Sequence, residues 1–505
     1  MAGLVGLALA ATRGTVAAAC HSTCTAQLAE CKRRCPEGGQ ARRDCREGCA
    51  ERSNCTAPGA RIRTLAYVVT ECTTDPQGRS SFKQKLLIRR GNCDPVTVVE
   101  FGPSPPVPDS SALCRAFGAF RSGDQTLSRN GLLPSVAVFQ GMTVLPDGSG
   151  VVFDVTSQFS DVPALTPEPP EEGVFFVRAD GSGLRRLGPP SRVPSLIFRR
   201  AASPDGRTIA FIDLGPSSAG YEAPQVFLLD VRSGARRQLT HQTHVAMLSI
   251  ADPGIGFPTF LDRRTIGFYA GSTATGTFTA FQVKVDGGPE KELPPIVVQS
   301  GAHIVSQFGV TGVHPHEVLG LYPDRPAEND HGDAPPFVRE VFLVDRKEIL
   351  QLTAFNRNDT TTGGEGGRGL IIGDRALFSA SVNRGENPHE ICQLFSVSTR
   401  GEQLRQLTRL PWDGRSSTHS CTFRPPGCGI WPLSMAADQI SGTVLFSASC
   451  DPVGANPFGE QIFAMRPDGT GLRQLTNARG MTTDSDGTVH VEFPTPFAYP
   501  SQKGG

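Results

Sequence analysis

Apolar and polar residues alternate in short segments that recur along the chain. Residues 461–476 (QIFAMRPDGTGLRQLT) align without a gap with residues 393–408 (QLFSVSTRGEQLRQLT). The same template fits further segments, at 173–188, 225–240, 279–294 and, in shortened form, 340–353. Because a period of two marks a half-buried strand, each unit predicts a strand, a tight turn and a second strand.

A second element lies upstream of each unit. Its clearest copies are residues 202–211 (ASPDGRTIAF) and 144–153 (VLPDGSGVVF), and degenerate copies occur at 260–268, 373–378 and 441–446. Pro-Asp-Gly predicts a hairpin turn, because glycine adopts the positive φ that such a turn needs. Each repeat therefore predicts four strands, A to D, and ends at a leucine: Leu187, Leu239, Leu293, Leu352, Leu407 and Leu475.

The paired motifs Ser-Pro-Asp-Gly…Ile-Ala-Phe and Arg-Gln-Leu-Thr resemble the repeat of TolB-like β-propellers. The resemblance covers roughly residues 140–480 and occurs six times, which is typical of a repeat fold. It implies an all-β fold with six clear propeller blades, over about 136–476. It also implies an exported envelope protein that binds other envelope proteins. The α/β domain that precedes the propeller in TolB itself is replaced here by a cysteine-rich segment.

The two ends of the propeller region, which is predicted over residues 58–500, suggest how it closes. Residues 62–101 predict a partial blade with strands at 64–70, 85–90 and 96–101 but no strand A. A closing strand is predicted at 488–494, where the next strand A belongs. Joining the two would form a composite seventh blade and would cover two exposed sheet edges. A six-bladed ring with accessory N-terminal strands is the alternative.

The 14 cysteines favour an oxidising compartment. Residues 1–19 predict a signal peptide, because an apolar stretch is followed by Ala17, Ala18 and Ala19 before Cys20. Cys20 would then be the first residue of the mature chain, where it is a possible lipidation site. The predicted location is the periplasm, the cell surface or the extracellular space. A lipid anchor would be the only membrane attachment.

Residues 20–57 predict a helical hairpin stapled by disulfides. The pairs Cys35–Cys45, Cys31–Cys49 and Cys24–Cys55 have nearly constant index sums, as antiparallel helices require, while a zinc site is the alternative. In the propeller, Cys421–Cys428 and Cys72–Cys114 are permitted pairs, because their positions map to one rim. Cys93 maps to the opposite rim, which argues against pairing with Cys72.

The longest predicted loops cluster on the rim that carries the B–C and D–A connections. They include segments 160–172, 215–224, 323–336, 383–389, 408–433 and 451–460. Long loops on one face of a rigid scaffold commonly form a recognition surface. The leading hypothesis is therefore a non-enzymatic, monomeric scaffold that binds an envelope or extracellular protein. A glycan- or small-ligand-binding module is an alternative. The formal net charge of +0 and the lack of a basic run argue against nucleic acid.

Four histidines suggest a competing hypothesis. His244, His303, His419 and His490 follow closing leucines and are predicted to border the mouth of the central channel, where they could bind a divalent metal. Some propeller lyases with TolB-like repeats use channel histidines, so a metal-dependent carbohydrate-active enzyme is the alternative to the scaffold. The sequence has no Gly-x-Ser-x-Gly, His-Glu-x-x-His or phosphate-binding glycine motif. No cofactor is predicted apart from that metal.

Overall fold

A computed structural model gives the fold of the chain. It describes residues 63–91, 93–104, 106–108, 114, 139–156, 171–192, 201–243, 258–272, 277–292, 296–297, 303–304, 318–323, 339–344, 349–354, 370–382, 387–412, 430–438, 441–448, 459–494 and 497–498. All regular elements with given bounds in these ranges are β-strands. The fold is the predicted all-β propeller.

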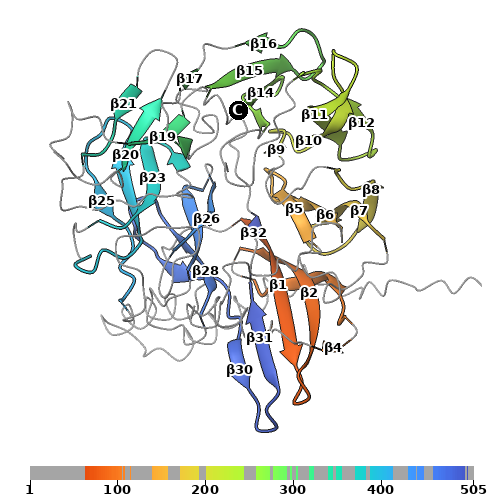
Figure 1. Cartoon of the computed structure of the whole chain (residues 1–505), viewed down its shortest axis with the longest axis vertical. Helices are drawn as coiled ribbons and strands as arrows, with labels where there is room; N and C mark the ends of the chain where they lie inside the picture. Colours follow the sequence, from red (N-terminus) through yellow and green to blue (C-terminus); the bar gives the residue numbers. More distant parts are fainter. Residues whose placement is uncertain are drawn as a thin grey trace, which may run out of the picture.

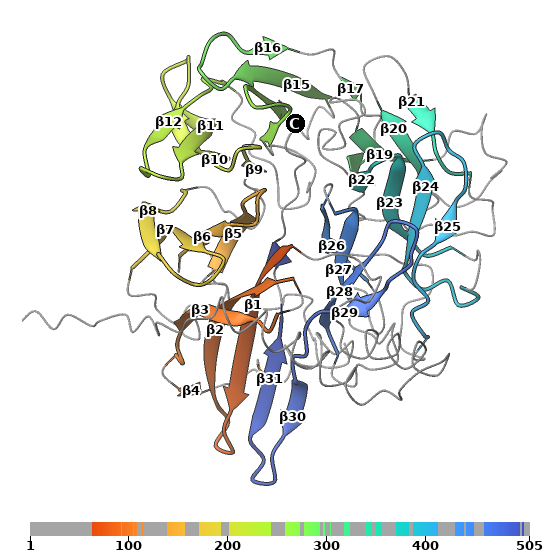
Figure 2. The same cartoon turned by 180° about the vertical axis from the view of Figure 1, so that it is seen from behind.

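Six antiparallel sheets correspond to the six predicted repeats, and each has its four strands in chain order. Figure 1 and Figure 2 show them around a common centre. The sheets are β5–β8 (Phe139–Val144, Gly150–Val155, Gly173–Arg178, Arg185–Gly188), β9–β12 (Ala201–Ala202, Thr208–Pro216, Glu222–Asp230, Arg236–Gln238), β13–β16 (Thr259–Phe260, Thr265–Ser272, Thr277–Lys284, Lys291–Glu292), β18–β21 (His303–Ile304, Val318–Pro323, Arg339–Val344, Ile349–Gln351), β22–β25 (Leu370–Ile372, Arg375–Ala380, Gln393–Ser398, Arg405–Gln406) and β26–β29 (Ile430–Asp438, Thr443–Ala448, Gln461–Met465, Arg473–Gln474). A further short strand, β17 (Ile296–Val297), pairs with β15.

A composite sheet joins strands from the two ends of the propeller region. Its central strand, β1 (Thr64–Thr74), pairs on one side with β2 (Arg79–Arg90), which in turn pairs with β3 (Val96–Phe101) and β4 (Val107–Pro108). On its other side, β1 pairs with β31 (Val489–Phe493) and with β32 (Phe497–Ala498). The outermost strand is β30 (Gly480–Thr483), which pairs with β31. The predicted pairing of the two ends is therefore confirmed.

Side chains of β1 show that the composite sheet is a blade of the ring. Leu65, Tyr67 and Val69 pack in one apolar cluster with residues of the last repeat, including Ile462 and Leu475. Ala66 and Val68 belong to a different cluster, which contains apolar residues of β5–β7 in the first repeat. Alternate residues of a strand point to opposite faces, so one sheet fills the space between the first and last repeats. We call it the composite blade.

The strand positions in the composite blade differ from the prediction in two ways. The segment Val489–Phe493 pairs with Thr70–Thr74, whereas β32 pairs with Ala66 and Tyr67 and, like β1, contacts β5. In addition, β1 and β2 extend through residues 71–74 and 79–84, which were not predicted as strands. Half of the predicted insertion at 215–224 is also strand, because β10 continues to Pro216 and β11 begins at Glu222.

A buried polar contact explains the repeated Gln…Leu-Thr motif. Thr476 Oγ1 accepts the backbone N–H of Ile462 at 2.9 Å and donates to Gln461 Oε1 at 2.8 Å. The Gln461 side chain also pairs with both the N–H and the carbonyl of Ala478. The same contacts recur around Gln393 and Thr408, and around Gln225 and Thr240. Each motif therefore links strand D to strand C, and the buried polar atoms of the Gln and Thr side chains are hydrogen-bonded.

An ion pair links the composite blade to both neighbours. Arg63, just before β1, forms a bidentate pair with Asp438 of the last repeat, at 2.7 Å and 2.9 Å, and the Asp438 side chain is 0% exposed. The same guanidinium donates to the carbonyl of Pro146 in the first repeat. Next to it, Gly148 has φ +72, and a Cβ there would lie 2.7 Å from Thr64 Oγ1. The Pro-Asp-Gly turn thus permits a close approach at the junction.

Candidate interaction surface

Part of the composite blade projects beyond the ring, at the bottom of Figure 1. It consists of residues 70–74 of β1, residues 79–84 of β2, and the hairpin of β30 and β31. We call this part the projecting ribbon. Strands β1 and β2 reach 11 and 12 residues in length, whereas the strands of the repeats span at most nine, so the blade is long enough to extend past its neighbours.

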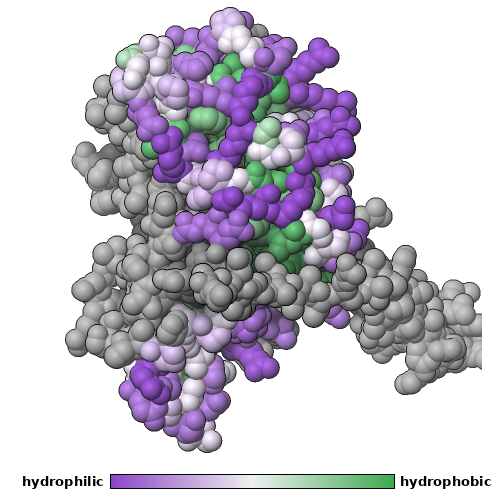
Figure 3. Space-filling model, turned by 90° about the vertical axis from the view of Figure 1, so that its right-hand side faces the viewer, coloured by the Kyte–Doolittle hydropathy of each residue, from purple (hydrophilic) through white to green (hydrophobic). Residues whose placement is uncertain are grey.

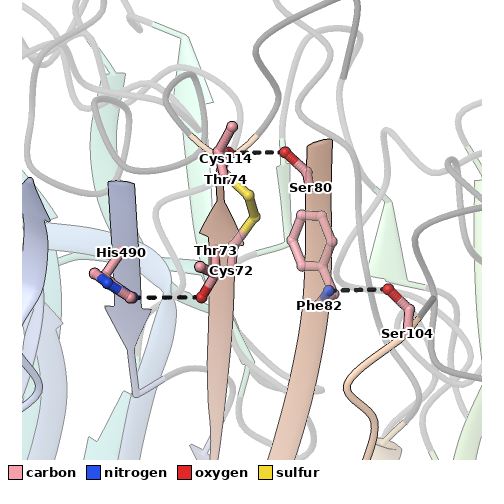
Figure 4. The surroundings of a disulfide bond; sticks show 8 residues. All are labelled: Cys72, Thr73, Thr74, Ser80, Phe82, Ser104, Cys114 and His490. Carbon is pink, nitrogen blue, oxygen red and sulfur yellow. Dashed lines mark hydrogen bonds between the residues drawn. A yellow bond between two sulfur atoms is a disulfide. The ribbon is translucent and has the colours of Figure 1, made fainter. Parts of the chain in front are cut away.

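One face of the projecting ribbon is covered and contains a disulfide (Figure 4). Cys72 and Cys114 are bonded, with Cα atoms 5.5 Å apart, as predicted from their shared rim. The two sulfurs pack in a cluster of buried residues with Phe82, Val489, Val491 and Phe493. Buried polar side chains complete this face in pairs: Thr74 with Ser80 at 2.7 Å, and Gln84 with Thr70 at 3.0 Å. The covered face is therefore a small core of its own.

The other face of the projecting ribbon and of the adjoining sheet is charged. Glu71 pairs with Lys85, and Lys83 lies 2.5 Å from Glu100. Glu71 and Glu492 are directly opposite on neighbouring strands. Burial raises the pKa of Glu492, and the negative charge of Glu71 adds to this shift. Contacts with Arg479 oppose it. This face thus presents both signs of charge. A positively charged group of a partner would stabilise the ionised form of Glu492.

The edge of the projecting ribbon is formed by β30. In the part of the chain that the structure describes, β30 pairs with β31 and with no other strand. Met481 is 41% exposed, and Thr482 and Thr483 are exposed beside it. Figure 3 shows that the end of the molecule where the ribbon lies is mainly hydrophilic. An exposed strand edge with one accessible apolar side chain can accept a further strand through backbone hydrogen bonds.

Only one of the four predicted histidines has a described side chain. His490 lies on β31 in the projecting ribbon, opposite Thr73, and not at the channel mouth. Its Nε2 lies 2.9 Å from Asp484 Oδ2 and its Nδ1 lies 3.5 Å from Thr73 Oγ1. The strand register sets this position, because residue 490 falls within the ribbon hairpin. The predicted convergence with the other three is not tested, because their side chains lie outside the described residues.

The remaining predicted site residues are not tested. His303 begins β18, but its side chain lies outside the described residues, as do His244 and His419. Cys20 and the predicted pairs Cys35–Cys45, Cys31–Cys49, Cys24–Cys55 and Cys421–Cys428 also lie outside them. Cys93 and Cys392 are each disulfide-bonded, and Cys93 is not paired with Cys72. The described residues contain no group of three or more metal-ligating side chains, and no helix among them could span a bilayer.

Comparisons with known proteins leave the family open. No family model matches the chain, and no curated protein matches it. Solved structures with a similar arrangement include an acylaminoacyl peptidase from Pyrococcus horikoshii, with 9% identity, a TM-score of 0.43, and coverage of 83% of this chain and 52% of that chain. This chain therefore spans about half the length of that peptidase.

Two further matches cover most of their own length. An oligogalacturonate lyase in complex with manganese has 9% identity and a TM-score of 0.42, with coverage of 81% of this chain and 97% of that chain. The β-propeller domain of the Trilobed protease from Pyrococcus furiosus, described as having an open velcro topology, has 10% identity and a TM-score of 0.37, with coverage of 70% and 88%. Likeness at this level assigns neither an activity nor a ligand.

Proposed function

We propose that the chain is an exported scaffold that binds a protein partner at the cell envelope, and that the projecting ribbon is its docking element. The observation that carries the proposal is the edge of β30, which pairs only with β31 among the described residues, on a sheet that extends beyond the ring. The ribbon has its own buried cluster and disulfide, and a rigid element of this kind favours a docking role. Export is supported by the described disulfides, which persist in oxidising compartments.

The partner would add a strand to β30. Backbone hydrogen bonds would supply affinity, and Met481 would supply an apolar contact at the edge. The charged face formed by Glu71, Lys83 and Glu492 lies beside this edge and would select a partner of matching charge pattern. The TolB-like resemblance of the repeats agrees with this role, since such proteins bind envelope proteins.

A capture experiment with a matched control tests this function. Met481→Lys places a charge on the ribbon edge, which opposes strand addition. Leu350→Lys is the control, because Leu350 is 38% exposed on β21, the outermost strand of a repeat sheet. Purified wild type and Leu350→Lys should capture the same envelope protein from an extract of the source cells, while Met481→Lys should lose it. Equal capture by all three proteins, or no capture by the wild type, would contradict the proposal.

The metal-dependent enzyme stays an alternative at His303 and His419. Metal analysis of the purified protein, with each histidine replaced by alanine, separates it from the scaffold. A stoichiometric metal that both variants lose would support the enzyme, whereas retention of the metal by the variants would place it elsewhere.

A further inference from the structure

We propose that His389 and Trp412 form a stacking platform for a pyranose ring of a neutral oligosaccharide. The proposal is independent of the ribbon, because the two residues lie in connections of the repeat sheet β22–β25. Their rings stack with centroids 4.2 Å apart and an interplanar angle of 21°. Trp412 is nevertheless 46% exposed, the largest exposed fraction among the large apolar side chains that the structure describes.

The two rings come from different connections at one end of the same sheet. His389 lies in the connection between β23 and β24, and Trp412 lies after β25 on the way to the next repeat. In an antiparallel four-stranded blade, these two connections are on the same rim. It is the rim on which the long loops were predicted to form a recognition surface. The stack therefore joins two of those loops at a defined point.

Buried amide side chains hold both segments in place. Gln393 accepts the N–H of Leu410 and donates to its carbonyl, each at 3.0 Å, which fixes the chain two residues before Trp412. Asn387 is 2% exposed and donates to the carbonyls of Val382 and Ile391. These contacts fix the turn that carries His389. A ligand would thus meet a preorganised surface and would lose little affinity to the ordering of protein groups.

The chemistry of the platform favours a sugar. An indole presents a negative π-face, and the C–H groups on one face of a β-linked pyranose form a flat, slightly positive apolar surface. One indole face is backed by His389, and Trp412 is nevertheless 46% exposed. The neighbouring Pro388 and Pro411 are exposed and add rigid apolar surface. Stacking of this kind uses the C–H face of the sugar and needs no charge on the ligand, so the expected ligand is a neutral oligosaccharide.

Two other ring-bearing ligands fit less well. Single-stranded nucleic acids stack on aromatic residues within a positively charged groove, whereas this chain has 49 basic and 49 acidic residues and no basic run. Proline-rich peptides dock in grooves lined by several aromatic rings. At this site the described part of the chain offers one indole and one imidazole. A peptide is therefore kept as an outcome of the test.

Fluorescence can report directly on the platform, because Trp412 and Trp431 are the only tryptophans of the chain. In a Trp431→Phe background, the signal comes from Trp412 alone. We expect cellohexaose or chitohexaose to change this signal saturably, and an oligouronate to bind more weakly. Saturable binding of a proline-rich peptide with no response to either sugar would overturn the proposal. No saturable response to cellohexaose or chitohexaose up to about 10 mM would also overturn it.

Calorimetry on variants then locates the site. Trp412→Ala should weaken binding of the responding sugar by about tenfold or more, and Trp412→Phe by about two- to fivefold, since a smaller ring stays in place. His389→Ala should weaken it by about threefold through loss of the backing. Tyr221→Ala is the matched control, because Tyr221 is 40% exposed in another repeat and should leave affinity unchanged. Wild-type affinity in Trp412→Ala, with an unchanged melting temperature, would show that the sugar binds elsewhere.

Discussion

The repeat sheets and the composite blade are all blades of one ring, but different contacts hold them in place. Each repeat sheet is built from one continuous segment, and in three of the six repeats a Gln–Thr contact joins the two outer strands. The composite blade pairs strands from opposite ends of the chain region, such as β1 with β31. Its polar contacts reach to both neighbouring blades, from Arg63 to Asp438 and to the carbonyl of Pro146. Local sheets use a local contact, whereas the blade that closes the ring uses long-range ones.

This difference follows from chain entropy. A repeat closes short loops, while pairing β1 with β31 orders a chain of several hundred residues between them. The entropic cost of closing a loop rises slowly with its length. The contacts that offset this cost form only when the rest of the ring is in place. The composite blade should therefore be the point at which the ring opens first. Four measurements address this expectation, in order of decreasing effect.

Arg63→Met should have the largest effect. It removes the guanidinium that pairs with Asp438, and a carboxylate that is 0% exposed then loses its positively charged partner while Ser441 still donates to it. Breaking a buried pair from one side costs about 3–5 kcal/mol. Urea unfolding at neutral pH measures the loss. Arg79→Met is the control, because it breaks the exposed Asp75–Arg79 pair, for which about 0–1 kcal/mol is expected. Similar losses in both variants would contradict a special role for the junction.

Removal of the Cys72–Cys114 disulfide should cost somewhat less. The bond closes a loop with a sequence separation of 42, for which about 2–4 kcal/mol is typical. The double variant C72A/C114A avoids a free thiol and keeps the site apolar. Hydrogen exchange should accelerate in β31 and in residues 70–74 of β1 before it does in β10 and β11. Uniform acceleration in all sheets would show that the ribbon is not a separate unit of stability.

Alkaline pH should open the same junction through Tyr67. Burial raises the pKa of this tyrosine from 10.0 to about 12, while Arg89 opposes the shift. Above pH 10 the unfolded chain loses the proton first, whereas the folded chain keeps it to about pH 12. The free energy of unfolding therefore falls between these values, by up to about 3 kcal/mol. Tyr67→Phe should remove this part of the pH dependence, and Tyr221→Phe, at an exposed site, should not.

Much of the repeat architecture could be predicted because the same motifs recur several times in the sequence. The period of two, the Pro-Asp-Gly turns and the closing leucines fix six sheets, and the pairing of Val489–Phe493 with the first strands follows from the two incomplete ends. The ribbon was missed because its covered face is partly polar. Ser80 and Gln84 are buried there beside Phe82, so the apolar alternation of β2 is interrupted although its pleat is regular.

The candidate site could be predicted much less well. His490 was assigned to the channel from its place after a closing leucine, but strand register places it on the ribbon. Strand β32 has two residues and follows Pro494 and Pro496, so no periodicity marks it. Asp438 and Arg63 lie 375 positions apart, and nothing local in either segment indicates their contact. The stack of His389 on Trp412 likewise depends on two loops that only the folded sheet brings together.

The smallest effect tests the local contact of the repeats. Thr476→Val keeps the shape of the side chain but leaves the N–H of Ile462 without its acceptor, at a cost of about 1–2 kcal/mol. Thr408→Val removes the same contact from the preceding repeat, and Thr482→Val changes an exposed threonine of β30 as a control. Thr408 and Thr476 contribute to their own sheets in the same way, so their losses in urea unfolding should be equal. A clearly larger loss for Thr476, whose neighbour Leu475 packs against β1, would mean that the contact also supports ring closure. The distinction between local and long-range stabilisation would then fail at the last repeat.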